Sequence, residues 1–266
     1  MLYHAENGAL PVGESVMDYI RFGSGEQTLV MLPGAGDGLK TVRGAALPFA
    51  LLYRDFARRC TVYVFSRRRD LPDGFTTRDM AADTARAMDA LGLKKACVLG
   101  VSQGGMIAQH LAVDRPDLVG KLILAVTLAR QNDVCRAVLT HWIDLARRGD
   151  SRALLLDTAE RSYSARYLRR MRPVYALAAR FGKPQSFDRF FATVNACLTH
   201  DAYDALPGIA CPTLVIGGAD DRIVTAQGSE DCAAQIPDSR LILYPGLGHA
   251  AYDETGDFWK RVLAFL

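Results

Sequence analysis

The sequence predicts an α/β fold in which a doubly wound, mostly parallel sheet carries an inserted helical cap. Two observations support this prediction. Short apolar runs alternate with helical patterns before residue 129 and after residue 208, whereas several helical patterns follow one another between about 129 and 208. An apolar run flanked by helices is typical of a parallel strand buried on both faces. We therefore predict a core of residues 1–128 and 209–266 and a helical cap of residues 129–208.

The predicted elements of the core follow from local patterns. The stretch 15–22, followed by Gly23-Ser24-Gly25, predicts an antiparallel edge strand. The clearest helix is 76–91, where Thr76 and Asp79 form a capping-box pattern and Gly92 follows the end. The buried strands share a short apolar run and are 28–32, 61–65, 96–100, 121–126, 213–217 and 241–244.

The cap region contains several helix starts, since serine and asparagine accept hydrogen bonds from the first free N–H groups of a helix. The predicted N-caps are Asn132, Ser151, Ser164 and Ser186. Neither an internal repeat nor a flexible linker occurs, so we expect the cap to pack on the sheet.

Composition limits the partners of this chain. Lys and Arg (32) nearly balance Asp and Glu (29), and the net charge of +3 is too small to indicate a nucleic-acid surface. No apolar run reaches the roughly 18 residues that a membrane span needs, and the first residues lack a secretory signal pattern. We expect a soluble, cytoplasmic protein that binds a small molecule.

The six cysteines are scattered and form no C-x-x-C pair. We interpret them as buried free thiols. Clustered Cys and His signatures and H-E-x-x-H are also missing from the sequence, so we expect neither a catalytic metal nor a cofactor.

The sharpest chemical signal is the G-x-S-x-G pattern of Gly100, Ser102 and Gly104, which follows an apolar strand and precedes the helical run 106–113. A serine at such a strand-to-helix turn is held in a strained conformation that exposes its hydroxyl. Glycines two residues to either side allow the strand and helix to approach closely. The pattern predicts Ser102 as a nucleophile.

With this motif the chain resembles the α/β-hydrolase superfamily, from about residue 15 to residue 266. The resemblance implies the fold and a catalytic triad in the order serine, acid, histidine, but no particular substrate. It rests on the first loop, the serine turn, an acidic turn and a glycine-rich histidine loop, which are 32–36, 100–104, 218–224 and 246–250.

The resemblance implies His249 as the base and an aspartate of the acidic turn as the residue that orients it. Asp220 and Asp221 are adjacent. In the family the aspartate usually lies three residues after a glycine, which from Gly218 favours Asp221 and leaves Asp220 as a turn residue. The family's other acid position, after the strand ending at Val126, holds no carboxylate here.

The resemblance also implies two backbone N–H donors for the oxyanion, those of Gln103 and Ala35. The usual His-Gly of the first loop is Pro33-Gly34 in this chain, which alters the loop but leaves the donor of Ala35 in place.

Two features have competing interpretations. Gly34-Ala35-Gly36 could be a dinucleotide loop with Arg67 reading a 2′-phosphate, but the third glycine of that pattern would fall at Leu39. The run of Arg67, Arg68 and Arg69 could attract an anionic substrate, although a solvated basic loop is the simpler interpretation. The same choice applies to the cap arginines, which are Arg161, Arg166, Arg169, Arg170 and Arg172.

The sequence as a whole predicts a serine hydrolase that acts on a small carboxylic ester through an acyl-serine intermediate. Hydrolysis of a carbon–carbon bond in a ketonic acid is the alternative reaction. A ligand-binding receptor that retains the triad is the alternative outside catalysis, since function depends on the site and not on the fold.

Overall fold

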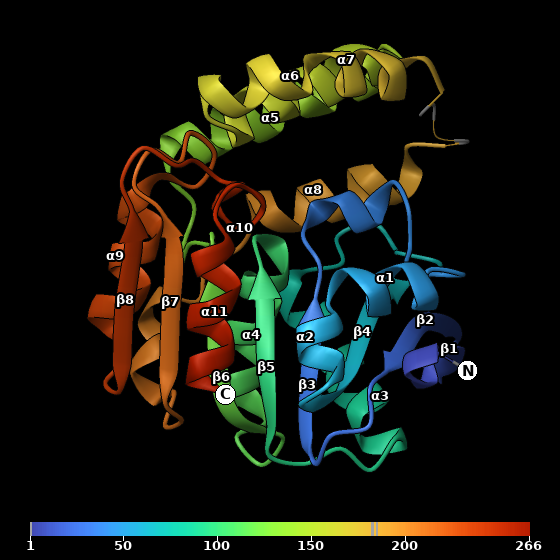
Figure 1. Ribbon diagram of the computed structural model, residues 1–266, viewed down its shortest axis with the longest axis vertical. Coiled ribbons are helices and arrows are strands. Elements are labelled where there is room, and N and C mark those ends of the chain that lie inside the picture. The colour runs from blue at the N-terminus through green and yellow to red at the C-terminus, as the bar shows by residue number, and fades with distance from the viewer. Residues whose placement is uncertain (1, 182–183, 185) are drawn as a thin grey trace.

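One sheet of eight strands runs through the molecule (Figure 1), in the order β1-β2-β4-β3-β5-β6-β7-β8. The computed structural model describes residues 2–181, 184 and 186–266. β1 and β2 pair antiparallel with each other, β2 pairs antiparallel with β4, and all other neighbours are parallel. The strands are β1 (Glu6–Val12), β2 (Ser15–Phe22), β3 (Gln27–Leu32), β4 (Cys60–Arg68), β5 (Ala96–Val101), β6 (Val119–Ala125), β7 (Thr213–Gly218) and β8 (Ser239–Tyr244).

The doubly wound, mostly parallel sheet is confirmed, and each predicted strand forms. The prediction that all of them are buried was wrong for β8, which is an edge strand without a buried residue. The stretch 15–22 forms an antiparallel strand as predicted, but its predicted place at the edge was wrong, because β2 lies between β1 and β4. The strand at that edge, β1, was missed. Its residues are mostly exposed and include Gly8 and Pro11, so β1 lacks the apolar run by which the other strands are recognised.

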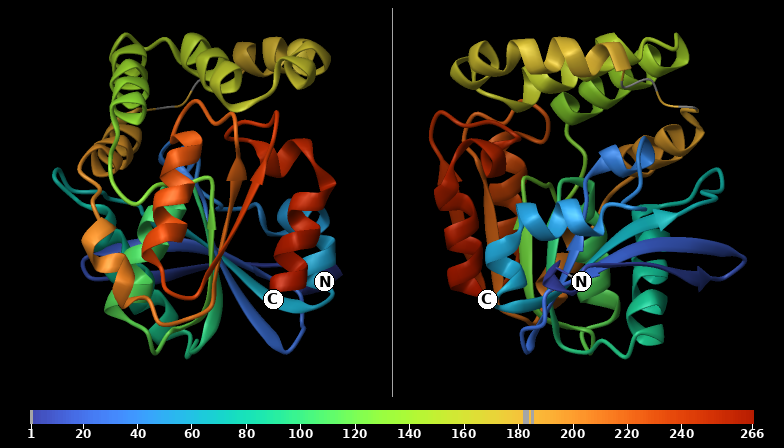
Figure 2. Two further views of the ribbon diagram at one scale, coloured as in Figure 1. Left: turned by 90° about the vertical axis from the view of Figure 1, so that its left-hand side faces the viewer. Right: turned by 45° about the vertical axis from the view of Figure 1, so that its right-hand side comes forward.

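Helices cover both faces of the sheet (Figure 2). α3, α4 and α9 pack on one face, whereas α1, α2 and α11 pack on the other. The α-helices are α1 (Ala46–Leu52), α2 (Arg54–Ala57), α3 (Thr77–Ala90), α4 (Gln103–Asp114), α5 (Asp133–Arg147), α6 (Ser151–Ser162), α7 (Ala165–Phe181), α8 (Asp188–Leu198), α9 (Thr225–Gln235), α10 (Ala251–Glu254) and α11 (Gly256–Phe265). Short 3₁₀ helices are η1 (Leu2–His4), η2 (Ala35–Gly38) and η3 (Tyr203–Gly208).

The helix starts agree largely with the capping patterns. Thr76 and Asp79 form the predicted capping box at α3, and Asn132 caps α5 as predicted. The prediction of Ser151 as an N-cap was wrong, because the side chain of Asp150 accepts the hydrogen bond at the start of α6. Asp and Ser are both favourable at an N-cap, so the sequence pattern alone does not show which of these two neighbours occupies the position.

The two other predicted caps also accept backbone hydrogen bonds near helix starts. Ser164 Oγ accepts from Tyr167 N at the start of α7. Ser186 Oγ accepts from Asp188 N, although the residue at the cap position of α8 is Phe187.

Helices α5, α6 and α7 form a layer above the carboxyl ends of the strands (Figure 1), and α8 returns toward the sheet. The layer is tied to the core by specific contacts. Asn132 Nδ2 donates to Val224 O (3.0 Å), and Ala250 N donates to Ser162 O (2.9 Å). In our proposed division into a core (1–128 and 209–266) and a cap (129–208), these contacts join the two parts.

All six cysteines are free, and only Cys211 is partly exposed. Among the described residues, no helix combines the length and apolar character needed to cross a bilayer. The described part of the chain also brings together no group of three or more metal-binding side chains.

A buried histidine pair lies between α3, α4 and the end of α8. His200 Nδ1 is 2.9 Å from Thr77 Oγ1, and the ring of His110 meets that of His200 edge-on with centroids 5.2 Å apart. Burial, followed by the charge of His110, lowers the pKa of His200 from its ordinary value of 6.5 to about 3. His200 is therefore neutral in the folded protein across the physiological range.

We predict that His200 makes the fold sensitive to acid. Below pH 6.5 the unfolded chain binds a proton at this residue and the folded chain does not, so the free energy of unfolding falls, by up to about 1.4 kcal/mol per pH unit, as the pH drops toward 3. Urea unfolding of His200→Gln between pH 7 and pH 4 should show a shallower slope than the wild type. His4→Gln, at an exposed histidine, should keep the wild-type slope; an unchanged slope in His200→Gln would contradict the assignment.

Candidate active site

Ser102 lies at the turn between β5 and α4 and adopts φ 54° and ψ −119°, a positive φ that is unfavourable for a residue with a side chain. The turn is possible because glycines flank it. A Cβ at Gly100 would lie 2.3 Å from Gly104 O, and one at Gly104 would lie 1.9 Å from Leu32 O. The strained turn and its two glycines thus have the geometry that the sequence predicts.

The loop after β3 runs directly against this serine. A Cβ built on Gly34 would lie 3.3 Å from Ser102 Cβ and 3.8 Å from Ser102 Oγ. Ala35 begins η2 and Gln103 begins α4. Because the first N–H groups of a helix have no acceptor within it, the backbone N–H groups of Ala35 and Gln103 are available to a ligand on either side of Ser102.

Asp221 and His249 are brought together from the ends of β7 and β8. His249 Nδ1 is 2.8 Å from Asp221 Oδ2, and both side chains are buried. Asp221 Oδ1 accepts from the N–H groups of Ile223 and Val224. The adjacent Asp220 is exposed and makes no such contact.

The environment of Asp221 keeps this carboxyl group ionised. Burial acts to raise its pKa. The charge of His249 and the hydrogen bonds from His249, Ile223 and Val224 together outweigh burial, and the pKa lies below its usual range. An ionised carboxylate accepts a hydrogen bond from Nδ1–H, which leaves the other ring nitrogen of His249 free to act as an acceptor.

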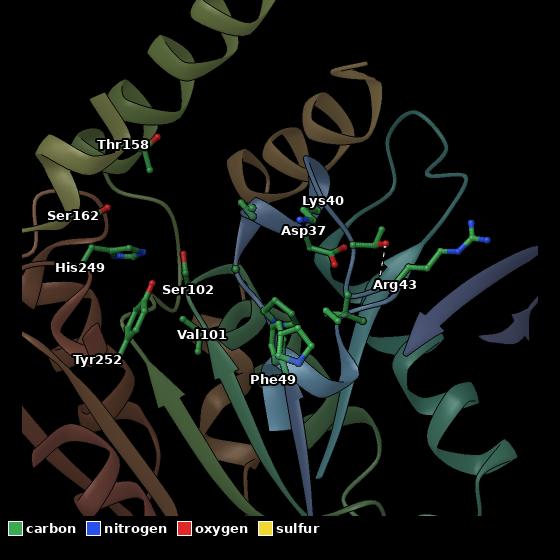
Figure 3. A pocket seen from close by; sticks show the side chains of 18 of the residues that line it. Asp37, Lys40, Arg43, Phe49, Val101, Ser102, Thr158, Ser162, His249 and Tyr252 are labelled. Atoms are coloured by element: carbon green, nitrogen blue, oxygen red, sulfur yellow. Dashed lines mark hydrogen bonds between the residues drawn. The ribbon is translucent and has the colours of Figure 1, made fainter. Parts of the chain in front are cut away.

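A pocket of about 680 Å³ joins Ser102 and His249. In Figure 3 the ring of His249 extends toward the space beside Ser102, and Tyr252 rises toward the same space from below. Val101, Phe49 and Tyr252 form apolar parts of its wall on the core side. The pocket therefore offers a partly open space next to the serine hydroxyl, which suits a small organic molecule.

The sequence analysis missed several residues that line this pocket. Trp142, Thr158 and Ser162 reach it from helices α5 and α6 of the cap, and Lys40 and Arg43 lie at its outer end (Figure 3). Trp142 belongs to the apolar face of α5 and has the pattern of a core residue. The only sequence signal for the two cations was their place shortly after the first loop.

The prediction that Arg67 to Arg69 form a solvated basic loop was wrong. β4 continues as far as Arg68. Arg67 is 4% exposed, Arg68 pairs with buried Asp83 (2.6 Å), and the half-exposed Arg69 pairs with buried Asp18 (2.6 Å). None of the three lines the pocket. Side chains of a strand point alternately to the two faces of the sheet. Because β4 includes Arg67, its side chain points to one of these faces, where it lies beneath the first loop.

The cap arginines follow the simpler interpretation. Arg166, Arg169, Arg170 and Arg172 are exposed, and Arg161 is partly buried beside Asp157 (2.7 Å). The pocket described above includes none of them.

The chain is similar to several known proteins. A hydrolase of 2-hydroxy-6-oxononadienedioate and 2-hydroxy-6-oxononatrienedioate from a Pseudomonas species is 28% identical over 289 aligned positions, covering 98% of this chain and 92% of its own. The enol-lactonase from Burkholderia xenovorans LB400 superimposes with a TM-score of 0.83 at 22% identity, over 97% of this chain and 99% of its own.

An alpha/beta hydrolase enzyme from a Medee basin deep-sea metagenome library superimposes with a TM-score of 0.85 at 19% identity, over 96% of this chain and 95% of its own. At these identities the two solved structures show a shared fold. Residues 27–255 match the family described as alpha/beta hydrolase fold. The chain therefore belongs to the α/β-hydrolase fold family.

Proposed function

We propose that this protein is a serine hydrolase that cleaves a small carboxylic ester through an acyl-serine intermediate. In this proposal Ser102 is the nucleophile, His249 is the base, and Asp221 orients the histidine. One observation carries it: His249, held 2.8 Å from the buried carboxylate of Asp221, lines the same pocket as a serine on a strained turn.

The proposed reaction uses only groups of the chain and water. His249 takes the hydroxyl proton as Ser102 Oγ bonds to the ester carbonyl carbon, and the Asp221 carboxylate stabilises the imidazolium that forms. The N–H groups of Ala35 and Gln103 stabilise the negative carbonyl oxygen. His249 then protonates the departing alcohol, and a water molecule activated by the same histidine releases the acid from Ser102.

Hydrolysis of a carbon–carbon bond in a ketonic acid is the second candidate. It is favoured by the Pseudomonas relative, a hydrolase of oxo-dienedioate compounds that aligns along 98% of this chain. Lys40 and Arg43 at the outer end of the pocket are suitably charged for a substrate carboxylate. Both side chains are exposed, and a solvated cation attracts a carboxylate only weakly, so the ester remains the first candidate.

Replacement of Ser102 by Ala should reduce kcat for a short p-nitrophenyl ester by about 10⁴- to 10⁶-fold, since it removes the nucleophile. Thermal unfolding should be near that of the wild type, because Ala and Ser differ by one hydroxyl. A fluorophosphonate should label the wild type at Ser102 and leave the variant unlabelled. Wild-type turnover by the folded variant would contradict the proposed function.

Asp221→Asn should lower kcat by about 10³- to 10⁴-fold, because the amide no longer holds His249 in the tautomer that accepts the serine proton. Asp220→Asn is the matched control: the change is chemically identical, but the residue is exposed and does not contact His249. Its kcat should remain within a small factor of the wild type. The reverse order of effects would assign the orienting role to Asp220.

The charge of the substrate distinguishes the two candidate reactions. For the ester hydrolase we expect kcat/KM for a neutral ester to equal or exceed that for its terminal-carboxylate analogue, and Lys40→Gln and Arg43→Gln to change either value less than about threefold, since exposed charges are screened. Arg169→Gln, an exposed arginine of the cap, is the control. A tenfold preference for the anion that Lys40→Gln or Arg43→Gln removes would favour the ketonic acid.

A further inference from the structure

Arg67 is a buried cation that the proposed reaction does not use. Its side chain lies under the first loop, and Nη2 donates to Pro33 O and, over 3.1 Å, to Gln103 Oε1. Its backbone N–H donates to Asp37 Oδ2 (2.9 Å). One nitrogen atom thereby joins the loop after β3 to the first residue of α4.

These two segments carry the two N–H groups assigned above to the oxyanion. The Pro33 carbonyl belongs to the peptide unit directly before the one that contains Ala35 N–H, and Gln103 carries the other donor. Resting on the proposed function, we infer that Arg67 is a positioning residue that holds both oxyanion donors at the correct separation. Such donors stabilise the transition state only when they are already aimed at the developing charge.

Helix α8 fixes this arrangement from the opposite side. Gln103 Nε2 donates to Thr193 O (2.6 Å), and Arg189 Nη2 donates to Asp37 Oδ2 (3.0 Å). The packing is close, because a Cβ at Gly38 would lie 2.9 Å from the Cα of residue 190 in α8. The Gln103 amide is therefore held at both ends, by Arg67 at its oxygen and by α8 at its nitrogen.

The bonding of Arg67 differs from that of an arginine with a structural role. Its neighbour Arg68 forms a two-point ion pair with Asp83. In contrast, the Arg67 guanidinium bonds only to neutral oxygens, and its Nε and Nη1 atoms have no hydrogen-bond partner among the described residues. Leaving a buried cation without a bonded carboxylate is costly for folding, which favours a role in the reaction.

The charge of Arg67 has the sign that the reaction requires. Burial lowers its pKa and the Asp37 carboxylate partly offsets this effect, yet an arginine remains a cation inside a protein. Arg67 and Arg189 carry two positive charges here, and Asp37 carries one negative charge. A net positive charge behind the donors stabilises a negative oxygen in front of them.

The test is Arg67→Met, which keeps the length and apolar stem of the side chain and removes its donors and charge. With a short p-nitrophenyl ester, kcat should fall by about 10- to 100-fold and KM should change less than about threefold, because the ester oxygen becomes an anion only in the transition state. Each measured rate is divided by the fraction of enzyme molecules whose serine a fluorophosphonate labels once the labelling reaction is complete. Affinity for a trifluoromethyl ketone should fall in parallel with kcat/KM.

Two further variants separate positioning from folding. Arg68→Met is the matched control on the same strand, because it removes a buried ion pair that lies away from the pocket; it should lower the unfolding temperature and leave kcat per titrated site unchanged. Arg67→Lys keeps a cation and a donor and should recover part of the lost kcat. A kcat per titrated site within twofold of the wild type in Arg67→Met would overturn the inference.

If Arg67→Met does not fold, Gln103→Met decides the question. It keeps the backbone N–H of residue 103 and removes both contacts of the amide, the one to Arg67 and the one to Thr193 O, so kcat should fall about tenfold at constant KM. An unchanged kcat would overturn the inference. Ser102→Ala is measured in parallel. Activity in Ser102→Ala refutes the proposed function, whereas an inactive Ser102→Ala with a fully active Arg67→Met refutes only the role of Arg67.

Discussion

The close approach of three backbone segments at Gly100 and Gly104 is the constraint on which the site depends. The end of β3, the end of β5 and the start of α4 meet there at distances that leave no space for a Cβ atom. The positive φ of Ser102 is stable only because these segments restrict the turn from every side. The same approach brings the first loop against Ser102, so one packing arrangement supplies both the serine and the N–H groups beside it.

The remaining site residues reach this point because parallel strands end at a common edge. Asp221 follows β7 and His249 follows β8, two neighbouring strands of the sheet. Their loops also contact the cap, since Ala250 N donates to Ser162 O and Asn132 Nδ2 donates to Val224 O. The cap helices therefore do more than cover the pocket, because they also anchor the loop that holds the histidine.

The prediction from charge alone was wrong for the three consecutive arginines at the end of β4. Long basic side chains are usually solvated, and three in succession resemble a basic loop. Here Arg67, Arg68 and Arg69 instead extend from the end of β4 in three different environments. Arg68 and Arg69 find aspartates on elements far away in the sequence, and Arg67 finds neutral oxygens under the first loop. Composition records the number of cations but not the groups that surround them.

The sequence by itself determined those features that follow from local chemistry. Apolar runs specified the strands from β3 to β8, the Thr76–Asp79 pair specified the start of α3, and glycines around Ser102 predicted a turn that only glycine permits. The spacing from Gly218 favoured Asp221, the aspartate that contacts His249 in the folded chain. Each of these features depends on residues close together in the chain, so a sequence pattern is sufficient to reveal it.

Only the tertiary structure decided which distant residues share a surface. β1 is a strand because β2 pairs with it, although its own residues are mostly exposed. Trp142 and Lys40 line one pocket because the cap lies over the first loop, and Arg67 is buried because that loop and α8 close over the end of β4. These outcomes depend on which faces of the elements meet. That meeting is set by the packing of the whole chain, and no local pattern encodes it.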